Sequence, residues 1–376
     1  SSQVKQLLQA LPGLGIQLAV ASNAPNRLTV ENRFQRAGLP IPNVIVTRAE
    51  IGTPKPSPDF IYRIRAETGA NLNEIVYIGD DDKTDAFCAI NAKVLPFTAH
   101  YSTSGKPMDY GLPVPSVEAL LDYLSTYAHQ SPPYFGWNFN GDCSDTNTTI
   151  SVYALFGQHG DLGLTQPLKR LLKDREDVFV GPKKNHLGSI LFHYAVSQTY
   201  LSGLIQGIDT VTVYPGHNIN TLNPVLATFS ADFPKFFKQK QMPQLLVRHT
   251  DSADSRLTPG AMRDIYEQFR TVHVNPEYER TIREKSILVL DDFTTSGCSF
   301  ETARRMLLQA GARRVVGLAI AKWGMDYTIT RISRGWNPFE PCDLDKSEIT
   351  TFRLNGSLNS QADEYFHEKI WLRYCQ

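Results

Sequence analysis

Two adjacent carboxylates followed by a short turn of small, hydroxylated residues form the most chemically informative stretch of this chain. Asp291 and Asp292 come directly after an apolar run, and the turn that follows contains Thr294, Thr295, Ser296 and Gly297. Backbone N–H groups of such a turn at a helix N-terminus can bind a phosphate. The carboxylates can accept hydrogen bonds from two adjacent ribose hydroxyls. The pattern therefore predicts a site for a ribose 5′-phosphate.

The residues on either side of this turn predict one strand–helix–strand unit of a parallel sheet. Residues 287–290 read as a buried strand, and residues 315–320 read as the next one. Between them, apolar residues recur at helical spacing, namely Ala303, Met306, Leu307 and Ala310. Ligands bind parallel sheets at the carboxyl ends of the strands, where the carboxylates and the turn would lie. The alternative is an ordinary strand-to-helix turn in which the polar side chains only cap the helix.

This order of strand, acid pair, hydroxylated turn and helix resembles the phosphoribosyl-pyrophosphate (PRPP) loop of type I phosphoribosyltransferases. The resemblance implies that Asp291 and Asp292 are catalytic residues and that Thr294 to Gly297 bind PRPP. It also implies a requirement for Mg²⁺ and a nucleobase or another amine as the acceptor. The protein contributes mainly electrostatic stabilisation as positive charge develops on the ribose ring.

The resemblance extends over residues 150–325, where the segment order is similar to the competence-protein-F-like branch of these transferases. In this family the loop after the strand that ends at Tyr214 contacts the pyrophosphate group. The resemblance therefore implies that Pro215, Gly216 and His217 contact the pyrophosphate of PRPP. Arg248 is the best cation for the leaving group, although a surface salt bridge is an equal alternative. Two features differ from the branch. A zinc module is replaced by another kind of domain, and an arginine-rich stretch is replaced by residues 216–222.

For two further segments, the predicted role rests on the resemblance alone. Residues 251–275 are polar, and such a segment is a mobile flap over the site in these transferases. The C-terminal extension, residues 326–376, would be either a hood that contacts the base or an interface.

The first part of the chain carries a second group of polar residues at the ends of predicted strands. Ser22 and Asn23 follow one strand, Lys55 lies in a proline-rich loop, and a cluster containing Asp80, Asp81 and Asp85 follows another strand. Phosphoryl chemistry needs this set of a hydroxyl donor, a fixed ammonium and carboxylates that can hold Mg²⁺. Taken singly, each residue is more typical of a cap, a solvated charge or a polar turn.

In this order and spacing, the residues resemble motifs two, three and four of the haloacid dehalogenase (HAD) superfamily of phosphohydrolases. Over residues 1–125 the alternation of helices and strands predicts the parallel sheet that this fold requires. The resemblance implies that Ser22, Asn23 and Lys55 bind the phosphoryl group of a phosphorylated small molecule. Asp80, with Asp81 or Asp85, would hold Mg²⁺.

The aspartate nucleophile that this superfamily uses on its central strand has no counterpart here. Residues 1–21 contain no Asp, and the pair Asp142 and Asp145 has the wrong spacing and comes after the other motifs. Without that carboxylate the covalent phosphoryl step has no acceptor. Three explanations are open: the chain is a fragment of a longer protein, it lacks residues that the continuous numbering does not count, or it is an inactive relic. We favour missing upstream sequence.

Composition excludes several classes of protein. The 376 residues allow about two or three domains. Lys plus Arg equals Asp plus Glu at 38 each, which argues against a nucleic-acid or anionic-membrane partner. No apolar run is long enough to cross a membrane, and the first residues lack a signal-peptide pattern. Five widely spaced cysteines favour a reducing compartment, so we expect a cytoplasmic protein.

The sequence thus predicts an α/β protein with two parallel-sheet domains, a HAD-like Rossmannoid domain followed by a type I phosphoribosyltransferase fold. The predicted boundaries are residues 1–125, a linker at 126–149, residues 150–325, and the extension 326–376. The predicted function is a PRPP-dependent transferase coupled to a phosphatase domain in nucleotide or nucleotide-like metabolism. A non-catalytic protein that senses PRPP or a nucleotide is the alternative. A DNA-uptake accessory factor is a weaker one, which the neutral charge opposes.

Overall fold

The chain forms two compact units, which are described separately. The computed structural model describes residues 2–102, 109–143, 148–157, 163–252 and 264–375. The first unit comprises Ser1–Gln130 together with Thr199–Gln206 and Pro234–Lys238. The second comprises Ser131–Gln198, Gly207–Phe233 and Gln239–Gln376. Each unit is therefore built from segments that are distant in the sequence.

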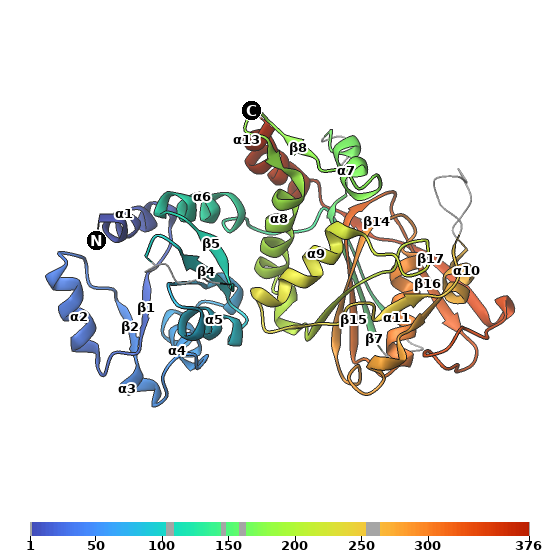
Figure 1. Cartoon of the computed structure of the whole chain (residues 1–376), viewed down its shortest axis with the longest axis horizontal. Helices are drawn as coiled ribbons and strands as arrows, with labels where there is room; N and C mark the ends of the chain where they lie inside the picture. Colours follow the sequence, from blue (N-terminus) through green and yellow to red (C-terminus); the bar gives the residue numbers. More distant parts are fainter. Residues whose placement is uncertain (1, 103–108, 144–147, 158–162, 253–263, 376) are drawn as a thin grey trace. The chain divides into compact units, whose positions relative to one another are not determined.

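The first unit alternates helices and short strands, as its sequence pattern predicts (Figure 1). Helix α2 shows the local cause: Asn26 accepts a hydrogen bond from the backbone N–H of Thr29 and so caps the first turn. The elements are α1 (Ser2–Ala10), β1 (Ala19–Ser22), α2 (Arg27–Arg36), β2 (Val44–Thr47), α3 (Arg48–Ile51), α4 (Asp59–Thr68), β3 (Val76–Gly79), α5 (Phe87–Asn91), β4 (Leu95–Ala99), β5 (Leu112–Val114) and α6 (Val117–Tyr127).

Two separate parallel sheets, rather than one, lie in the first unit. Strand β1 pairs with β2, and β3 pairs with β4, which in turn pairs with β5. Strands β2 and β4 are buried along their whole length, whereas every residue of β1 and β3 is only half-buried. Within the described part of the chain, β1 and β3 each have one edge without a ladder partner. The central strand β4 is thus more buried than its neighbour β3, and of the two strands in the smaller sheet β2 is more buried than β1.

The two short later segments complete the first unit. The Tyr200 hydroxyl donates to the backbone carbonyl of Ile75. Lys93 and Gln206 exchange side-chain to backbone hydrogen bonds at 2.9 and 2.6 Å.

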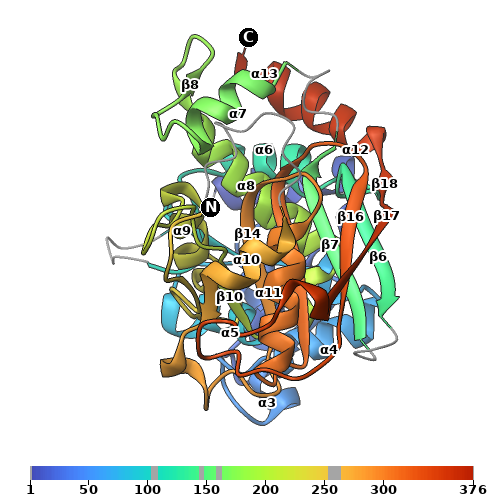
Figure 2. The ribbon, with the colours of Figure 1, turned by 90° about the vertical axis from the view of Figure 1, so that its right-hand side faces the viewer.

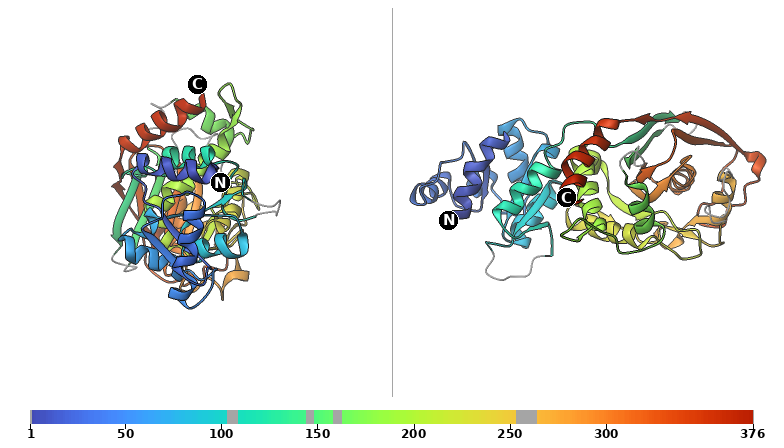
Figure 3. Two further views of the ribbon diagram at one scale, coloured as in Figure 1. Left: turned by 90° about the vertical axis from the view of Figure 1, so that its left-hand side faces the viewer. Right: turned by 90° about the horizontal axis from the view of Figure 1, so that it is seen from above.

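At the N-terminus, α1 and α6 lie side by side, and Gln6 donates to Glu118 at 2.7 Å (Figure 3).

The second unit is organised around a seven-stranded sheet with the strand order β11-β10-β14-β15-β7-β6-β18. Strands β11, β10, β14, β15 and β7 are parallel, and β6 and β18 add an antiparallel edge (Figure 2). The sheet strands are β6 (Trp137–Cys143), β7 (Thr148–Phe156), β10 (Thr210–Val213), β11 (Lys240–Gln241), β14 (Ser286–Thr294), β15 (Arg314–Lys322) and β18 (Ser357–Leu358).

Further strands form three separate antiparallel pairs, and helices connect the strands. The pairs are β8 (Phe179–Val180) with β9 (Asn185–His186), β12 (Leu246–Arg248) with β13 (Val272–Val274), and β16 (Asp326–Ile332) with β17 (Ile349–Asn355). The helices are α7 (Thr165–Leu172), α8 (Leu187–Leu201), α9 (Pro224–Asp232), α10 (Ile265–Thr271), α11 (Cys298–Gln309), α12 (Ser360–Tyr365) and α13 (Leu372–Cys375).

Helices cover both faces of the large sheet (Figure 1). On one face, Ile287 and Val289 of β14 share a core cluster with residues of α10 and α11, including Phe300. Gly317 of β15 lets α11 approach closely, because a Cβ at that position would lie 2.6 Å from the Phe300 ring. Side chains alternate along a strand, so Leu288 and Leu290 point to the other face, where α8 and α9 lie.

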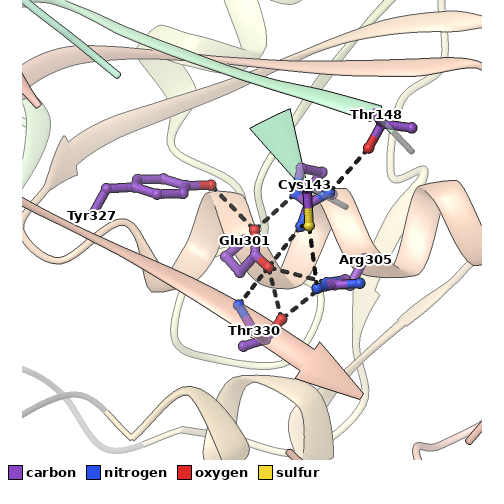
Figure 4. Close-up of polar contacts among 7 residues, drawn as sticks. Cys143, Thr148, Glu301, Arg305, Tyr327 and Thr330 are labelled. Atoms are coloured by element: carbon purple, nitrogen blue, oxygen red, sulfur yellow. Dashed lines mark hydrogen bonds and ion pairs between the residues drawn. The ribbon is translucent and has the colours of Figure 1, made fainter. Parts of the chain in front are cut away.

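A buried ionic cluster fixes the start of α11 (Figure 4). Glu301 is fully buried and receives hydrogen bonds from Arg304 at 2.8 Å and from Arg305 at 3.1 Å. Its carboxylate also accepts from the backbone and hydroxyl of Thr330 in β16, at 2.8 and 2.7 Å. Cys143 of β6 lies 3.6 Å from the Arg304 guanidinium. The cluster therefore joins the first turn of α11 to β16 and β6.

The stretch predicted to be a linker, residues 126–149, contains strand β6, which pairs with β7 from Trp137 to Cys143. Trp137 and Phe139 are buried in the core of the second unit, so these aromatics are core residues of a strand. Among the described residues, none of the helices is long and apolar enough to span a membrane.

Candidate functional sites

Asp292 is held from two sides by residues at the ends of helices. Lys173, directly after α7, lies 2.6 Å from one carboxylate oxygen, and Asn223, the N-cap of α9, donates to the other at 3.2 Å. Asn223 also donates to the carbonyl of Leu172 at 2.8 Å. Neighbouring Asp291 accepts from the backbone N–H of Asp292 at 2.8 Å. Both residues are half-buried, and Asp292 also accepts from the backbone N–H of Phe293 at 2.6 Å.

The turn after β14 is held in a fixed conformation at the N-terminus of the 12-residue helix α11. Gly297 has φ 75°, and a Cβ there would lie 2.3 Å from Tyr327, so only glycine fits. The backbone N–H of Thr328 donates to the Ser296 carbonyl at 2.7 Å. Thr295 is exposed and Ser296 half-buried, whereas Thr294 is buried. A phosphate could therefore approach the backbone N–H groups and the hydroxyls of Thr295 and Ser296.

A buried lysine lies beneath this turn. The Lys322 ammonium donates to the carbonyl of Thr295 and, at 3.0 Å, to that of Trp323, and it lies 4.8 Å from the centre of the Trp137 ring. Burial lowers the pKa of Lys322 to about 8. The ammonium is therefore mostly charged at neutral pH and holds the turn from the inside.

The Arg248 guanidinium, predicted to be the cation for the leaving group, is turned into the protein. Its side chain is 2 % exposed, and its guanidinium donates to the Gly216 carbonyl, to Thr271 and, at 3.1 Å, to Gln268. Arg248 is therefore engaged with protein groups and supports the 216–221 loop, instead of presenting a cation to a leaving group. Pro215 is also buried, and it has no backbone N–H to donate to pyrophosphate.

The 216–221 loop is closed on itself. The backbone N–H of Gly216 donates to the Thr221 carbonyl at 2.8 Å, and a Cβ on Gly216 would lie 2.6 Å from the Thr221 hydroxyl. The backbone N–H of Ser252 donates to the carbonyl of half-buried His217 at 2.9 Å. Of the predicted flap, residues 253–263 lie outside the described residues, so the flap stays a prediction.

In the first unit, Lys55 is the centre of a polar cluster. Its ammonium lies 2.5 Å from Asp85, 3.1 Å from the Tyr77 hydroxyl of β3 and 3.3 Å from the Ala21 carbonyl of β1. The backbone N–H of Lys55 donates to Asn23 at 2.7 Å. Burial and then the Asp85 charge raise the pKa of Tyr77. The structure thus brings Asn23, Lys55 and Asp85 together.

Ser22 lies beside this cluster, at the end of β1. Its hydroxyl accepts from the backbone N–H of Ala24 at 3.2 Å, and its side chain is half-buried.

The carboxylates predicted to hold Mg²⁺, Asp80 with Asp81 or Asp85, each have another partner. Asp85 is paired with Lys55, Asp80 accepts from the Ser102 hydroxyl at 3.0 Å, and Asp81 accepts from Thr84 at 2.9 Å as a helix cap. No group of three potential metal ligands occurs within the described ranges. As they stand, these side chains do not fit a complete Mg²⁺ site, and we derive no step through one.

Sequence reasoning missed three residues of these sites: Lys173, Tyr77 and Lys322. The contact between Lys173 and Asp292 joins residues 119 positions apart, so local periodicity contains no signal for it. The apolar strand 315–320 did contain a weak signal for Lys322, because a lysine that directly extends a buried strand needs a partner.

Comparison with known proteins identifies the type of the first unit. Residues 1–98 match the family described as haloacid dehalogenase-like hydrolase, which confirms that part of the prediction. The match includes the residues of the Lys55 cluster and ends before the second unit. A crystal structure of a HAD phosphatase from Thermococcus onnurineus is 17 % identical with a TM-score of 0.30, over 33 % of this chain. The match covers 57 % of that chain. No curated protein matches this chain.

Proposed function

We propose that the second unit is a phosphoribosyltransferase that uses PRPP as its Mg²⁺ complex. The observation that supports it is the Asp291–Asp292 pair at the carboxyl end of β14, followed by an open turn at the N-terminus of α11. In this proposal the turn binds the 5′-phosphate, and the helix N-terminus adds a favourable partial charge. The family match ends at residue 98 and has no bearing on this unit.

The proposed reaction exchanges one bond at the ribose anomeric carbon for another. The bond from this carbon to pyrophosphate breaks, pyrophosphate leaves with the electron pair, and an acceptor nitrogen forms the new bond. Asp291 and Asp292 would bind the ribose hydroxyls and stabilise the positive charge that develops on the ring. Lys173 and Asn223 would hold Asp292 in place, and Arg248 would support the loop that faces pyrophosphate.

Binding of Mg²⁺–PRPP to the full chain, followed by calorimetry, is the first test. We expect the double variant Asp291→Asn plus Asp292→Asn to weaken binding at least tenfold, since both charged acceptors are lost. The matched control, Glu340→Gln plus Asp343→Asn, removes two exposed carboxylates and should bind like the parent chain.

Pyrophosphate release with a panel of nucleobases then separates two functions. Release supports the transferase. Tight PRPP binding without release for any base supports the sensing alternative. Unchanged binding in the Asp291 and Asp292 variant would refute both.

For the first unit we propose a phosphate site for a phosphorylated small molecule, formed around Asn23, Lys55 and Ser22. The family match supports it, as do the contacts of Lys55 with Asn23, with the Ala21 carbonyl of β1 and with the Tyr77 hydroxyl of β3. Phosphoryl transfer to the protein would require one more carboxylate. We propose that an extended segment between β1 and β3 supplies it, because each of these strands has an edge without a ladder partner among the described residues.

Adding such a segment tests this proposal. An apolar strand that ends in Asp, joined by a flexible linker ahead of residue 1, should confer hydrolysis of p-nitrophenyl phosphate. The same extension with Ala in place of Asp is the matched control and should be inactive. Lys55→Met should abolish the gained activity, because the ammonium that balances the phosphoryl charge is lost. Equal activity of the Asp and Ala extensions would overturn the proposal.

A further inference from the structure

A cavity of about 420 Å³ in the second unit lies between the end of α7, the start of α8 and the start of α9. Its volume is within the range of small-molecule sites. Its inner wall is apolar and aromatic: Phe192 and Phe229 meet edge to face with ring centroids 5.0 Å apart, beside Leu171 and Val225. Helices α8 and α9, which supply the two rings, lie next to each other (Figure 1). This wall suits a planar aromatic ring.

The rim of the cavity is mainly acidic. Glu176, Asp177 and Asp232 line it together with Arg175 and with His186, whose Nε2 lies 3.5 Å from Asp177. Arg170, outside the lining, pairs with Glu176 at 2.6 Å. Burial lowers the pKa of His193 to about 4, so this lining histidine adds no positive charge at neutral pH. Carboxylates therefore outnumber cations at the opening. A ligand with phosphate or carboxylate groups would be repelled, and a ligand with a protonated amine would be attracted.

The walls of the cavity are directly connected to the partners of Asp292. Leu171 precedes Lys173 by two residues, and Pro224 follows Asn223 directly. Asn223 ties the two walls to each other through the Leu172 carbonyl at 2.8 Å. Lys173 and Asn223 contact the two carboxylate oxygens of Asp292 at 2.6 and 3.2 Å. A ligand that changes the spacing of α7 and α9 must therefore move at least one partner of Asp292.

We propose that this cavity binds a cationic aromatic amine, a planar ring that bears a protonated amino group, as an effector of the Asp292 site. The ring lies against Phe192 and Phe229, and the amine lies at the rim near Asp177. Binding is coupled through Lys173 and Asn223 to the carboxylate that receives the ribose. The binding site itself rests on the cavity alone, whereas the coupling rests on the proposed function of the second unit.

Three indole compounds of similar size test the binding site on the full chain. By calorimetry or ligand-observed NMR, tryptamine should bind more tightly than indole, and indole more tightly than indole-3-acetate. Asp177→Asn should reduce the preference for tryptamine over indole by at least threefold and leave indole binding unchanged. Equal affinity for all three compounds, or tighter binding of the anion, would overturn the proposal.

Blocking the cavity gives an independent control. Ser189 is exposed and lines the cavity, whereas Ala231 of α9 is exposed and does not line it. Ser189→Trp should abolish tryptamine binding, and Ala231→Trp should leave it unchanged. Tryptamine binding that persists in Ser189→Trp would place the ligand elsewhere and refute the site.

The coupling is tested by measuring PRPP affinity with and without saturating tryptamine. Coupling energies between linked sites typically change affinity about 5- to 150-fold, and the same factor must apply to tryptamine affinity when PRPP is present. We expect a change of at least about fivefold in the parent chain and none in Ser189→Trp. If tryptamine binds but PRPP does not, the proposed function fails while the cavity site stands. If both bind without mutual effect, the effector role is refuted.

Discussion

At the scale of single residues, the second unit contains a lysine whose charge is costly to bury. Lys322 is fully buried, and burial lowers its pKa to about 8 from the usual 10.5. Between these values the unfolded chain holds a proton that the folded chain has released. Unfolding therefore takes up a proton, and raising the pH through this window stabilises the folded protein relative to the unfolded one.

The variant Lys322→Met lacks the titrating ammonium, so comparing it with the parent chain gives the pH dependence of stability that Lys322 contributes. We expect the stability of the parent chain, relative to the variant, to increase by about 2 kcal/mol between pH 7.5 and pH 9.5. Urea unfolding at both pH values, followed by tryptophan fluorescence, measures the difference. A difference that is the same at both pH values would show that Lys322 has an ordinary pKa.

A second feature at this scale is the orientation of Arg248. Arg248 was expected to be a cation near the pyrophosphate, and it lies at that loop. Its guanidinium, however, points into the protein and holds Gly216. Residue type and spacing predicted the neighbourhood, whereas the direction of the side chain depends on Thr271 and Gln268, which lie 23 and 20 residues away.

At the scale of elements, the position of α11 depends on the buried Glu301 cluster. Glu301→Gln would leave Arg304 and Arg305 buried without their counter-charge, because Glu301 is their shared partner (Figure 4). Breaking a buried ion pair from one side typically costs about 3–5 kcal/mol. We expect a loss of stability of this size in urea unfolding.

The matched control is Glu267→Gln on α10, whose side chain is 56 % exposed and forms only a 3.8 Å pair with Arg270. Exposed pairs of this kind contribute about 0–1 kcal/mol. Equal effects of the two substitutions would contradict a structural role for the cluster. Because α11 begins directly after the phosphate turn, Glu301→Gln should also weaken PRPP binding, whereas Glu267→Gln should not.

The elements of the sheets were predicted better than the stretch between the two units. Strand β14 and helix α11 follow the apolar pattern of residues 286–310, since one strand and one helix each bury a single continuous set of side chains. Strand β6 was missed although Trp137 and Phe139 alternate with Asn138 and Asn140, because asparagine and Gly141 have a low strand propensity. Its pairing with β7 supplies the stability that its local propensity lacks.

At the scale of the whole molecule, the first unit contains segments that a simple division of the chain would remove. Tyr200, Phe236 and Phe237 are buried and belong to the segments assigned to the first unit. In residues 131–376 alone, Tyr200 would lose the carbonyls of Leu72 and Ile75 that accept from its hydroxyl, and the segments around these rings would lose the rest of their unit. We expect this fragment to bind a hydrophobic dye and to aggregate.

Co-expression with residues 1–130 is the control and should restore solubility. A fragment 131–376 that is soluble and does not bind the dye would show that the later segments do not need the first unit. The domain boundaries predicted at residues 125 and 150 stay a prediction that this experiment addresses.

The sequence by itself determined the chemistry at strand ends: the acid pair and turn after β14, and the Ser22, Lys55 and Asp80 positions of a HAD-like domain. These features are local, because strand, turn and helix each result from interactions between residues close in the chain. Only the tertiary structure decided which side chains meet. Lys173 and Asn223 reach Asp292 from 119 and 69 residues away, Arg248 turns inward, and Asp85 pairs with Lys55 instead of with the other carboxylates. Packing of distant elements sets these contacts, and no local periodicity encodes them.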